Sequence, residues 1–499
     1  CAHGAITFKT DIEGFWYPTV NKDKCVNCEL CEKVCPIINI KELKKNDLSQ
    51  PVYYAAEHKN MEVVFDSTSG GLFSALADIM YKDKGYVGGA VFNEDFSVRQ
   101  YISNDKTDLP RIRSSKYLQS SFEGFFIQVR KLLCAGEKIL ICGSPCQMTA
   151  LRAFLRKDYD NLIIVDYICR GINSPKVWHK YLDSFEERYG SKVIYCKAKS
   201  KEYGWRNLTQ KVILANGKHV YETKDQSNYT KGYLQTNVYC RPSCYECKFK
   251  GYPRIADITL ADFWGIEKIN TSMDKNLGTS LVMLNSKKGK AYFERTKQRI
   301  NYLEVPFSLA EKSNPALNQP LGNPLVNRNQ FFKDLDRMTF TELANKYILP
   351  CKQGKKQFVK DRLGYVCNIM KTTQMRPRPL WQLLKYNTIG EIFRGNILLP
   401  APYCIIHINK TATIRKQGIT FLGQKVKFRK SKLETRLSVD AGATLNLGPG
   451  TIIGYGSDIE IFSGATLTFK GHGGSNIGLT VVCGEHIEFG DRVMIGRNV

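Results

Sequence analysis

The sequence has no run of about 18 apolar residues, so no transmembrane helix is expected. It is poor in acidic residues: 47 Asp and Glu stand against 73 Lys and Arg, a formal net charge of +26. No secretory signal peptide is visible, which favours a cytoplasmic protein. Residue 1 is Cys rather than Met, so we expect the chain to be a fragment of a longer protein.

The shortage of negative charge favours an anionic partner such as phosphate, a flavin, nucleic acid or a lipid surface. Residues 351–440 alone hold 19 Lys and Arg but only 4 Asp and Glu. We interpret this stretch as a solvated linker, a surface that packs on the following domain, or a contact for an anionic membrane surface or phosphate-linked lipid carriers. The last of these would place the protein at the inner face of the membrane. Nucleic acid is not expected as a partner, because no nucleic-acid module is evident.

The length of 499 residues predicts about two to five domains, and 43% hydrophobic residues suffice for sizeable cores. Strand-like runs at 138–142 and 162–167 alternate with helical stretches such as 147–156, which indicates an α/β or α+β domain. The predicted domains are a Cys-rich module (1–45), an α/β or α+β domain (50–345), a basic, Pro-containing linker (346–412) and a repeat domain (413–499).

The 17 cysteines are clustered, which in a chain without a secretion signal indicates metal ligands rather than a disulfide framework. Cys25, Cys28, Cys31 and Cys35, followed by Pro36, have the C-x2-C-x2-C-x3-C-P spacing of bacterial ferredoxins. We therefore predict a 4Fe–4S cluster. A zinc site and plain core thiols are the alternatives, and zinc does not call for this spacing.

The first residues resemble the tail of a preceding ferredoxin motif, with Ala2 in place of its Pro. Cys1 would then complete the cluster of Cys25, Cys28 and Cys31, and Cys35 would bind a second cluster whose other ligands precede this sequence. A cysteine that stands at the terminus by chance is the alternative.

A second group of cysteines, Cys240, Cys244 and Cys247, is followed by cationic residues that would offset thiolate charge. An inner iron–sulfur cluster is the favoured interpretation over zinc. A radical-SAM site fits poorly, because Glu246 stands where that family usually has an aromatic residue. Cys146, where a predicted strand turns into a helix, is a candidate ligand or nucleophile.

Two segments could bind phosphate. Residues 67–71, rich in hydroxyls and glycine, directly precede a helical stretch and predict either a phosphate-binding turn or an ordinary helix cap. Residues 111–120 offer cations, an aromatic ring and an amide, and form either a binding loop or a solvated surface.

Taken together, these segments resemble the iron–sulfur flavoprotein family of the coenzyme F420 (deazaflavin) hydrogenase and dehydrogenase β subunits. The resemblance covers about residues 1–345 and is carried by six motifs: 69–73, 115–120, 143–147, 166–171, 242–265 and 278–281.

The resemblance implies a flavin, usually FAD, and a 4Fe–4S cluster near it. The flavin would be held by Ser69, Gly70, Gly71, Arg113, Ser115, Lys116, Tyr117 and Gln119. The inner cluster would be bound by Cys240, Cys244 and Cys247 with Cys146 as fourth ligand, or with Cys169 as the alternative. Arg170 stands where the family commonly has His, and a guanidinium that stays protonated is not expected to act as acid or base.

The end of the chain repeats with a period of six, an aliphatic or small residue followed by another position rich in Gly. The series is Ile453, Ile459, Ala465, Gly471, Ile477, Cys483, Phe489 and Ile495. This pattern predicts a left-handed β-helix of hexapeptide units and resembles trimeric acyltransferases. Their catalytic His follows a unit such as 495–499, so we expect His472 and His486 to be solvated coil residues. A trimerisation module without catalysis is the alternative.

We therefore expect an iron–sulfur flavoprotein oxidoreductase that passes electrons from ferredoxin-type clusters through an inner cluster to a flavin and on to a substrate. A redox protein or reduced cofactor would be the donor. The fusion resembles proteins of bacterial cell-surface polysaccharide pathways, so the substrate would be a small molecule or a lipid-linked sugar. A sugar acyltransferase with a regulatory redox half, and a non-enzymatic electron carrier, are the alternatives. No catalytic acid–base residues can be named.

Overall fold

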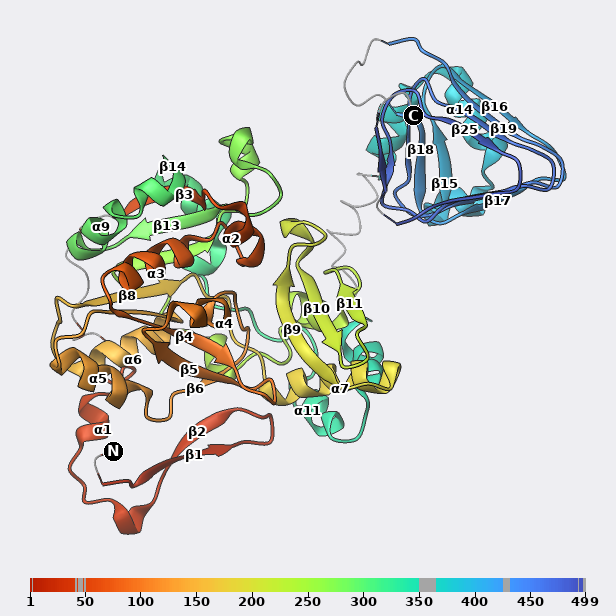
Figure 1. Cartoon of the computed structure of the whole chain (residues 1–499). Coiled ribbons are helices and arrows are strands. Elements are labelled where there is room, and N and C mark those ends of the chain that lie inside the picture. The colour runs from red at the N-terminus through yellow and green to blue at the C-terminus, as the bar shows by residue number, and fades with distance from the viewer. Residues whose placement is uncertain are drawn as a thin grey trace. The chain divides into compact units, whose positions relative to one another are not determined.

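The computed structural model describes residues 1, 3–40, 43, 48, 51–349, 365–424, 431–491 and 493–496. The chain forms two compact units, Cys1–Lys352 and Gln353–Val499 (Figure 1). Within the described ranges, every helix is too short or too polar to cross a lipid bilayer.

The first unit begins with an antiparallel hairpin of β1 (Ile6–Thr10) and β2 (Trp16–Val20). At its tip Asp11 accepts the backbone N–H groups of Glu13 and Phe15. Gly14 has a φ of +87°, and a Cβ there would lie 2.4 Å from the Cβ of Lys176. Glycine therefore lets the hairpin tip approach the helix that carries Lys176. The short helices η1 (Lys22–Lys24) and α1 (Leu30–Lys33) follow the hairpin.

A nine-stranded mixed sheet forms the centre of the first unit, in the order β14-β3-β13-β12-β8-β7-β4-β5-β6. The neighbours β4, β7, β8 and β12 run parallel to one another, and the pairs on the β3 side run antiparallel. Its strands are β3 (Val52–His58), β4 (Tyr86–Phe92), β5 (Val98–Ser103), β6 (Ser120–Ser121), β7 (Ile139–Gly143), β8 (Leu162–Tyr167), β12 (Ile258–Asp262), β13 (Ser280–Leu284) and β14 (Ile300–Glu304).

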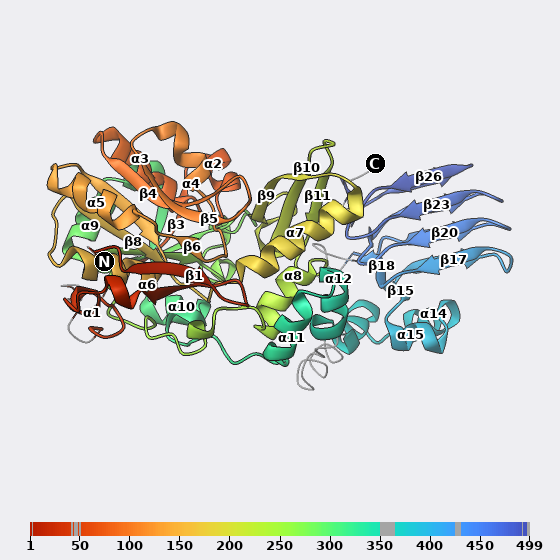
Figure 2. The ribbon, with the colours of Figure 1, turned by 90° about the horizontal axis from the view of Figure 1, so that it is seen from below.

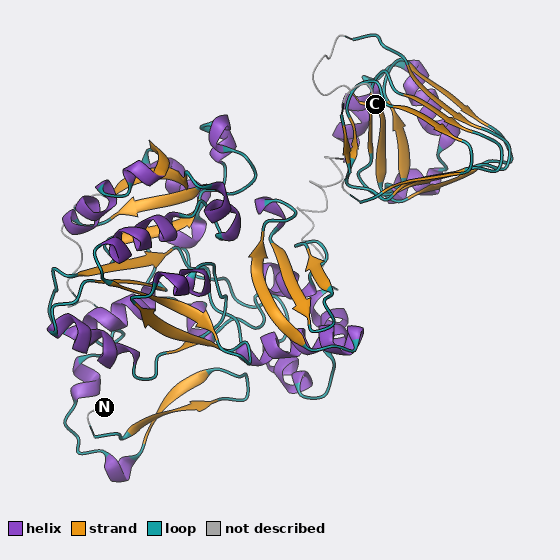
Figure 3. Ribbon diagram, in the orientation of Figure 1, coloured by secondary structure: helices purple, strands orange, loops and turns teal. Residues whose placement is uncertain are grey.

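Helices cover both faces of this sheet (Figure 3). Leu140, Ile163 and Val165 pack with α3 (Leu72–Lys82) and α9 (Lys287–Glu294) on one face. Ile139 and Ile141, among others, pack with α5 (Phe125–Cys134) and α6 (Pro145–Leu155) on the opposite face. Successive strand residues point to opposite faces, so these fully apolar runs are buried on both sides. The prediction of an α/β or α+β domain with strands near 138–142 and 162–167 is confirmed.

A smaller antiparallel sheet of β9 (Val193–Ser200), β10 (Thr209–Leu214) and β11 (His219–Glu222) lies beside the large one (Figure 3). Its core is aromatic, with Trp178 and Tyr181 of α7 packed against Phe340 and neighbouring side chains. The remaining described helices of this unit are α2 (Met61–Asp66), α4 (Leu109–Ile112), α7 (Pro175–Tyr189), α8 (Asn228–Lys231), α10 (Phe307–Ser313), α11 (Arg328–Leu335) and α12 (Phe340–Leu343), with short η segments between them.

The second unit is built from three parallel sheets, ordered β15-β18-β21-β24-β27, β16-β19-β22-β25 and β17-β20-β23-β26. Consecutive strands enter the three sheets in turn, so the chain winds into a parallel β-helix with a triangular cross-section (Figures 1 and 2). The strands are β15 (Ile397–Pro400), β16 (Cys404–Ile408), β17 (Thr413–Lys416), β18 (Ile419–Gln424), β19 (Thr435–Val439), β20 (Thr444–Leu447), β21 (Ile452–Gly454), β22 (Asp458–Ile461), β23 (Thr466–Phe469), β24 (Gly474–Ser475), β25 (Thr480–Cys483), β26 (His486–Phe489) and β27 (Met494–Ile495).

Ile453, Ile459 and Ala465 of the predicted series lie six residues apart in the buried core, but the six-residue period does not hold from one coil to the next. Three six-residue units would give a coil of about 18 residues, yet Asp458 pairs with Thr480, 22 positions along the chain. Alternate residues of each strand point inward, as with Ile459 and Ile461, so the strand pleat and the coil length set the stacking. Ile477 of the six-residue series lies outside the buried core. The left-handed sense stays a prediction, and residues 497–499, near the expected catalytic His, lie outside the described residues.

The segment predicted as a linker, 346–412, contains regular structure where it is described. Residues 365–373 are helical, and α14 (Pro377–Tyr386) and α15 (Ile389–Arg394) precede β15. Leu383 of α14 packs on Ile397 and Leu399, while the Asn387 side chain accepts the Leu398 N–H at 2.8 Å and donates to its carbonyl at 2.9 Å. These contacts attach the helices to the first coil and agree with the alternative of a surface that packs on the following domain.

We predict that Ile459→Ala destabilises the second unit by about 2–5 kcal/mol, because the fully buried side chain stacks between neighbouring coils and its removal leaves a cavity. The matched control is Val482→Ala on β25, whose side chain is 54% exposed. Calorimetry of the full chain should show a lower transition temperature for Ile459→Ala and almost none of that shift for the control. Equal shifts would contradict the assigned strand faces.

Candidate functional site

A cavity of about 430 Å³ lies where the nine-stranded sheet meets the three-stranded sheet. Cys142, Tyr167 and Asp262, at the ends of β7, β8 and β12, form part of its wall. These three strands are parallel, so their carboxyl ends meet at one edge of the sheet. The smaller sheet contributes Lys199 and Gln210 from the other side. The fold thus places a cavity where open α/β sheets commonly bind ligands.

Most of the predicted flavin residues line this cavity. They are Ser69, Gly71, Arg113, Ser115, Lys116 and Tyr117. Gly71 has a φ of +83° and is the N-cap residue of α3, so the backbone turns sharply at the cavity wall. Two segments far apart in the sequence, 67–71 and 113–117, are therefore brought together.

Two predicted flavin residues, Gly70 and Gln119, make structural contacts instead. Gly70 donates its N–H to Ser280 Oγ at 2.9 Å, and a Cβ there would lie 2.5 Å from the carbonyl oxygen of Ala56. Gly70 therefore serves the close packing of its turn against β3 and β13. The Gln119 side chain accepts the Trp16 N–H at 2.9 Å and donates to its carbonyl at 3.0 Å. Gln119 thus fastens the β1–β2 hairpin, which we call the ferredoxin hairpin, to the domain built around the nine-stranded sheet.

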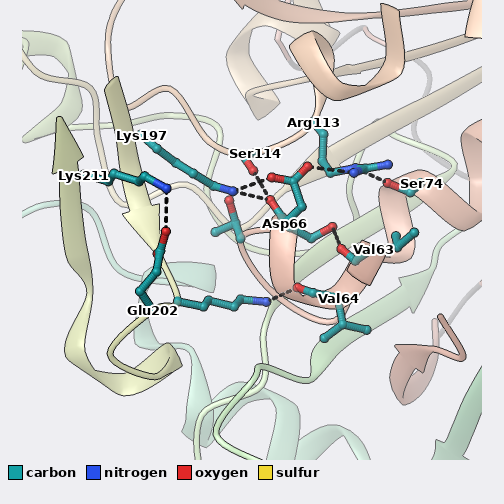
Figure 4. A network of polar contacts seen from close by, with 12 residues as sticks. Val63, Val64, Asp66, Ser74, Arg113, Ser114, Lys197, Glu202 and Lys211 are labelled. Atoms are coloured by element: carbon teal, nitrogen blue, oxygen red, sulfur yellow. Dashed lines mark hydrogen bonds and ion pairs between the residues drawn. The ribbon is translucent and has the colours of Figure 1, made fainter. Parts of the chain in front are cut away.

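The carboxylate of Asp66 joins the two cavity loops (Figure 4). It binds Lys197 Nζ at 2.6 Å and Arg113 Nη1 at 2.7 Å. Burial alone would raise the pKa of Asp66, but these two cations hold it below the ordinary value. Ser114 Oγ donates to the Asp66 carbonyl at 2.8 Å, and the Ser115 N–H donates to Thr68 Oγ1 at 2.8 Å. Arg113 is thus a positioning residue engaged by a carboxylate.

Two lysines line the cavity, and each has polar partners. Lys116 Nζ donates to the carbonyls of Arg111, Ile112 and Arg113 at 2.7 to 3.1 Å, and burial lowers its pKa to about 7. Lys199 Nζ binds Asp262 at 2.6 Å and lies 4.8 Å from the ring centre of Trp264.

One acceptor in the cavity wall lacks a donor. Gln100 Nε2 donates to Ser120 Oγ at 3.1 Å, but its buried Oε1 has no hydrogen-bond partner among the described residues. A buried amide oxygen without a donor is costly, so a ligand N–H or O–H would complete this site.

Four cysteines gather beside the cavity. Cys169, which lines it, follows β8, and Cys146 lies in the first turn of α6. Burial and then the thiols of Cys146 and Cys244 raise the pKa of Cys169, and Cys247 adds to the effect. Burial likewise raises the pKa of Cys244 to about 11, with Cys146 and Cys247 opposing its ionisation. Each of these four thiols therefore lies within the electrostatic reach of others in the set.

Cys240 lies apart from this group. It is fully buried in the aromatic core, and its thiol donates to Asn173 Oδ1 at 3.4 Å. Burial raises its pKa to about 12, and among the four gathered cysteines only Cys244 contributes. In the described part of the chain no three His, Cys, Asp or Glu side chains form a ready-made metal site. The candidate ligands are therefore identified by their thiol groups and by the effect of these thiols on one another's pKa.

The ferredoxin-type cysteines lie on the loop that follows the hairpin. Cys25 ends η1, Cys31 lies in α1 and Cys35 comes just after it. Cys1 Sγ accepts the Ala5 N–H at 3.4 Å, and the Ala5 carbonyl accepts the Asn21 N–H. The N-terminal cysteine thus lies at the hairpin end from which the cysteine loop departs.

Residues 136–306 match the family model for the C terminus of the coenzyme F420 hydrogenase/dehydrogenase beta subunit. Residues 18–37 match the model of the 4Fe-4S binding domain, which confirms the predicted motif. The chain is an iron–sulfur redox protein related to the F420 hydrogenase beta subunit.

Among solved structures, a chain of the F420-reducing [NiFe] hydrogenase complex from Methanosarcina barkeri is 16% identical. The match covers 57% of this chain and 100% of that chain, with a TM-score of 0.36. Comparison with curated proteins gives no match.

Sequence reasoning missed several residues of this iron–sulfur protein's cavity. Asp66 directly precedes the 67–71 turn, and Trp264 lies inside the 242–265 motif, so both had a local signal. Lys199 and Gln100 come from strands without a motif, and only the pairing of those strands brings them to the cavity. Arg170 donates to the Tyr233 carbonyl at 2.7 Å and to Asn237 Oδ1 at 2.7 Å. These bonds make Arg170 a positioning residue.

We predict that Asp66→Asn destabilises the first unit by about 1 kcal/mol at neutral pH, a modest value because the carboxylate is partly exposed. Since the folded pKa is lowered, the stabilisation is fully present above the ordinary Asp pKa of about 3.9 and is lost as the pH falls through the folded value. Urea unfolding at neutral and acidic pH measures this difference. The control, Glu202→Gln, breaks only the nearby pair with Lys211. A pH-independent difference would contradict the argument.

Proposed function

We propose that the first unit is an iron–sulfur flavoprotein oxidoreductase, with the flavin in the cavity and an inner 4Fe–4S cluster beside it. The observation that carries the proposal is that Cys169 lines the cavity, while the thiols of Cys146, Cys244 and Cys247 are near enough to raise its pKa. A ligand in the cavity would therefore lie next to a cluster bound by these thiols.

The proposed ligands of the inner cluster are Cys146, Cys169, Cys244 and Cys247, with Cys169 in place of Cys240. Four thiolates are the usual ligand set of a cubane. Burial raises the pKa of Cys146, Cys169 and Cys244. The positive charges of Lys250 near Cys169 and of Arg241 near Cys244 partly offset this rise. Lys250 Nζ also donates to the Cys169 carbonyl, which orients that loop.

The cavity residues fit a flavin, for three reasons. The volume suits a cofactor-sized ligand. The buried Gln100 Oε1 can accept a hydrogen bond from a ring N–H. Arg113 and Lys197 bring two positive charges to the single carboxylate of Asp66, and this surplus favours phosphate or an electron-rich ring system. When bound, a flavin would link one-electron transfer from clusters to two-electron chemistry on a substrate. The chain's part is to position both groups and exclude water.

The ferredoxin hairpin lies against the inner cysteines through Arg241. Its guanidinium donates to the Trp16 carbonyl at 3.3 Å and lies 4.3 Å from the ring centre of Tyr17. The same cation acts on the ionisation of Cys146 and Cys244. Arg328 binds Glu13 at the hairpin tip. These contacts support electron entry through the ferredoxin module.

We predict that Cys169→Ala lowers the iron content of the anaerobically purified chain by about four atoms, one cubane, and that Cys240→Ser does not. Iron and acid-labile sulfide per folded chain are measured, with exposed Cys134→Ala as control. If Cys240→Ser loses the iron while Cys169→Ala keeps it, the ligand set is Cys146, Cys240, Cys244 and Cys247.

We predict that Ala198→Trp on β9 lowers the flavin content at least about tenfold, because the added ring fills part of the cavity that the buried Ala198 lines. Ile194→Trp on the same strand, at a position 60% exposed, is the control and should keep its flavin. Flavin released by acid is quantified by fluorescence, together with iron. Full flavin retention in Ala198→Trp would exclude this cavity as the flavin site. A wild-type chain with iron but no flavin would instead favour a non-enzymatic electron carrier.

The polysaccharide and acyltransferase roles, and a trimer through the β-helix, stay predictions. His472 and His486 are exposed, as expected for solvated coil residues, and His472 Nδ1 lies 3.2 Å from Asp491 Oδ1. The parallel β-helix agrees with the predicted architecture of this unit, but it does not test the acyltransferase activity or the trimer.

A further inference from the structure

The helices before the β-helix expose large apolar side chains. On α14, Trp381 is 58% exposed and Leu384 65% exposed, and Ile389 at the start of α15 is 72% exposed. Met370 and Met375, on and just after the helical stretch 365–373, are about half exposed. We call these five side chains the apolar patch. Single exposed apolar residues are ordinary on proteins, whereas exposed apolar side chains grouped together and bordered by polar residues can mark an interaction surface.

The orientation of the patch follows from the packing of α14. Leu383 is buried against the first coil, whereas Leu384 and Trp381 lie three residues apart on the other side of the helix. Asn387 bonds both backbone groups of Leu398, and Lys416 Nζ donates to the Tyr386 carbonyl at 2.8 Å. The helix is therefore attached to β15 by one face and presents the other outward. Figure 2 shows α14 and α15 at the β15 end of the stacked coils.

The sequence that carries the patch is strongly cationic. Within residues 365–416 the cationic residues are Lys371, Arg376, Arg378, Lys385, Arg394, Lys410, Arg415 and Lys416. The sequence of this range has a single carboxylate, Glu391, and it is paired with Lys416 at 2.9 Å. The Lys385 ammonium lies 4.7 Å from the Trp381 ring centre, so positive charge borders the apolar patch directly.

We propose that the apolar patch binds the surface of an anionic phospholipid bilayer, with its side chains in the interfacial layer and the surrounding cations on the headgroups. An amphipathic helix with Trp and Leu on one side and Lys and Arg beside them is suited to lie in the interface plane. Each cation near an anionic surface adds attraction that salt weakens. A second copy of the chain is a poorer occupant, because a symmetric contact would bring the same cations against one another.

The test is co-sedimentation of the full chain with vesicles of phosphatidylcholine alone or mixed with phosphatidylglycerol. The variant Trp381→Ser/Leu384→Ser removes the centre of the patch. The matched control is Ile405→Ser/Val482→Ser, which changes two exposed apolar residues on strands of the same unit. A third variant, Arg378→Gln/Lys385→Gln, removes two cations. Circular dichroism confirms that each variant is folded.

We expect the wild-type chain and the control to bind phosphatidylglycerol vesicles, less so at high salt, and to bind phosphatidylcholine at least about tenfold more weakly. Trp381→Ser/Leu384→Ser should lose at least about tenfold in affinity, and the cation variant should become less sensitive to salt. Absence of wild-type binding to anionic vesicles, or equal binding by the patch variant, overturns the proposal. The proposal is also overturned if the wild-type chain binds no vesicles and forms an oligomer that Trp381→Ser/Leu384→Ser dissociates. The patch would then join copies of the chain.

Discussion

The parallel pairing of β7, β8 and β12 is the constraint on which the redox site depends. It brings their carboxyl ends to one edge of the sheet, where the loops that follow must meet. Cys146 follows β7, Cys169 follows β8, and thiols of the segment that carries Cys244 and Cys247 raise the pKa of both. The same edge also forms one wall of the cavity. Thiols and cavity are thus neighbours because of sheet topology, which no local sequence feature encodes.

The cations around this edge of the sheet are mostly paired with carboxylates or backbone carbonyls. Lysines that would be costly to bury are paired or engaged by carbonyls, as with Lys199 on Asp262 and Lys116 on three backbone oxygens. Asp66 is held ionised by Lys197 and Arg113 and so fastens the two cavity loops. Arg113 and Lys197 together exceed the single charge of Asp66, which suits an anionic cofactor, and Lys250 and Arg241 would offset the charge of cluster thiolates.

The second unit shows a different kind of order. Its apolar core is a set of ladders, such as Leu437, Ile459 and Val481, that stack because parallel strands pair in register from coil to coil. Phe469 and Phe489 end another ladder with rings 4.7 Å apart. Helix α14 covers the first coil, and its opposite face carries the apolar residues and cations from which we infer membrane contact.

Local patterns in the sequence were sufficient for several conclusions. The ferredoxin spacing of Cys25, Cys28, Cys31 and Cys35 identified a 4Fe–4S motif, because ligands within eleven residues are positioned by one short loop. Alternating apolar runs indicated β7, α6 and β8, since a buried strand or helix is recognised by its own residues.

Tertiary structure decided the rest. The placement of Cys169 beside the other thiols and of Cys240 in the aromatic core depends on how distant segments pack. The docking role of Gln119 depends on Trp16, 103 residues away in the sequence. Coil lengths of 22 and then 20 residues are set by strand pairing, which a six-residue pattern in the sequence does not reveal. Motifs determine which chemistry the chain carries, whereas long-range contacts determine which side chains meet to perform it.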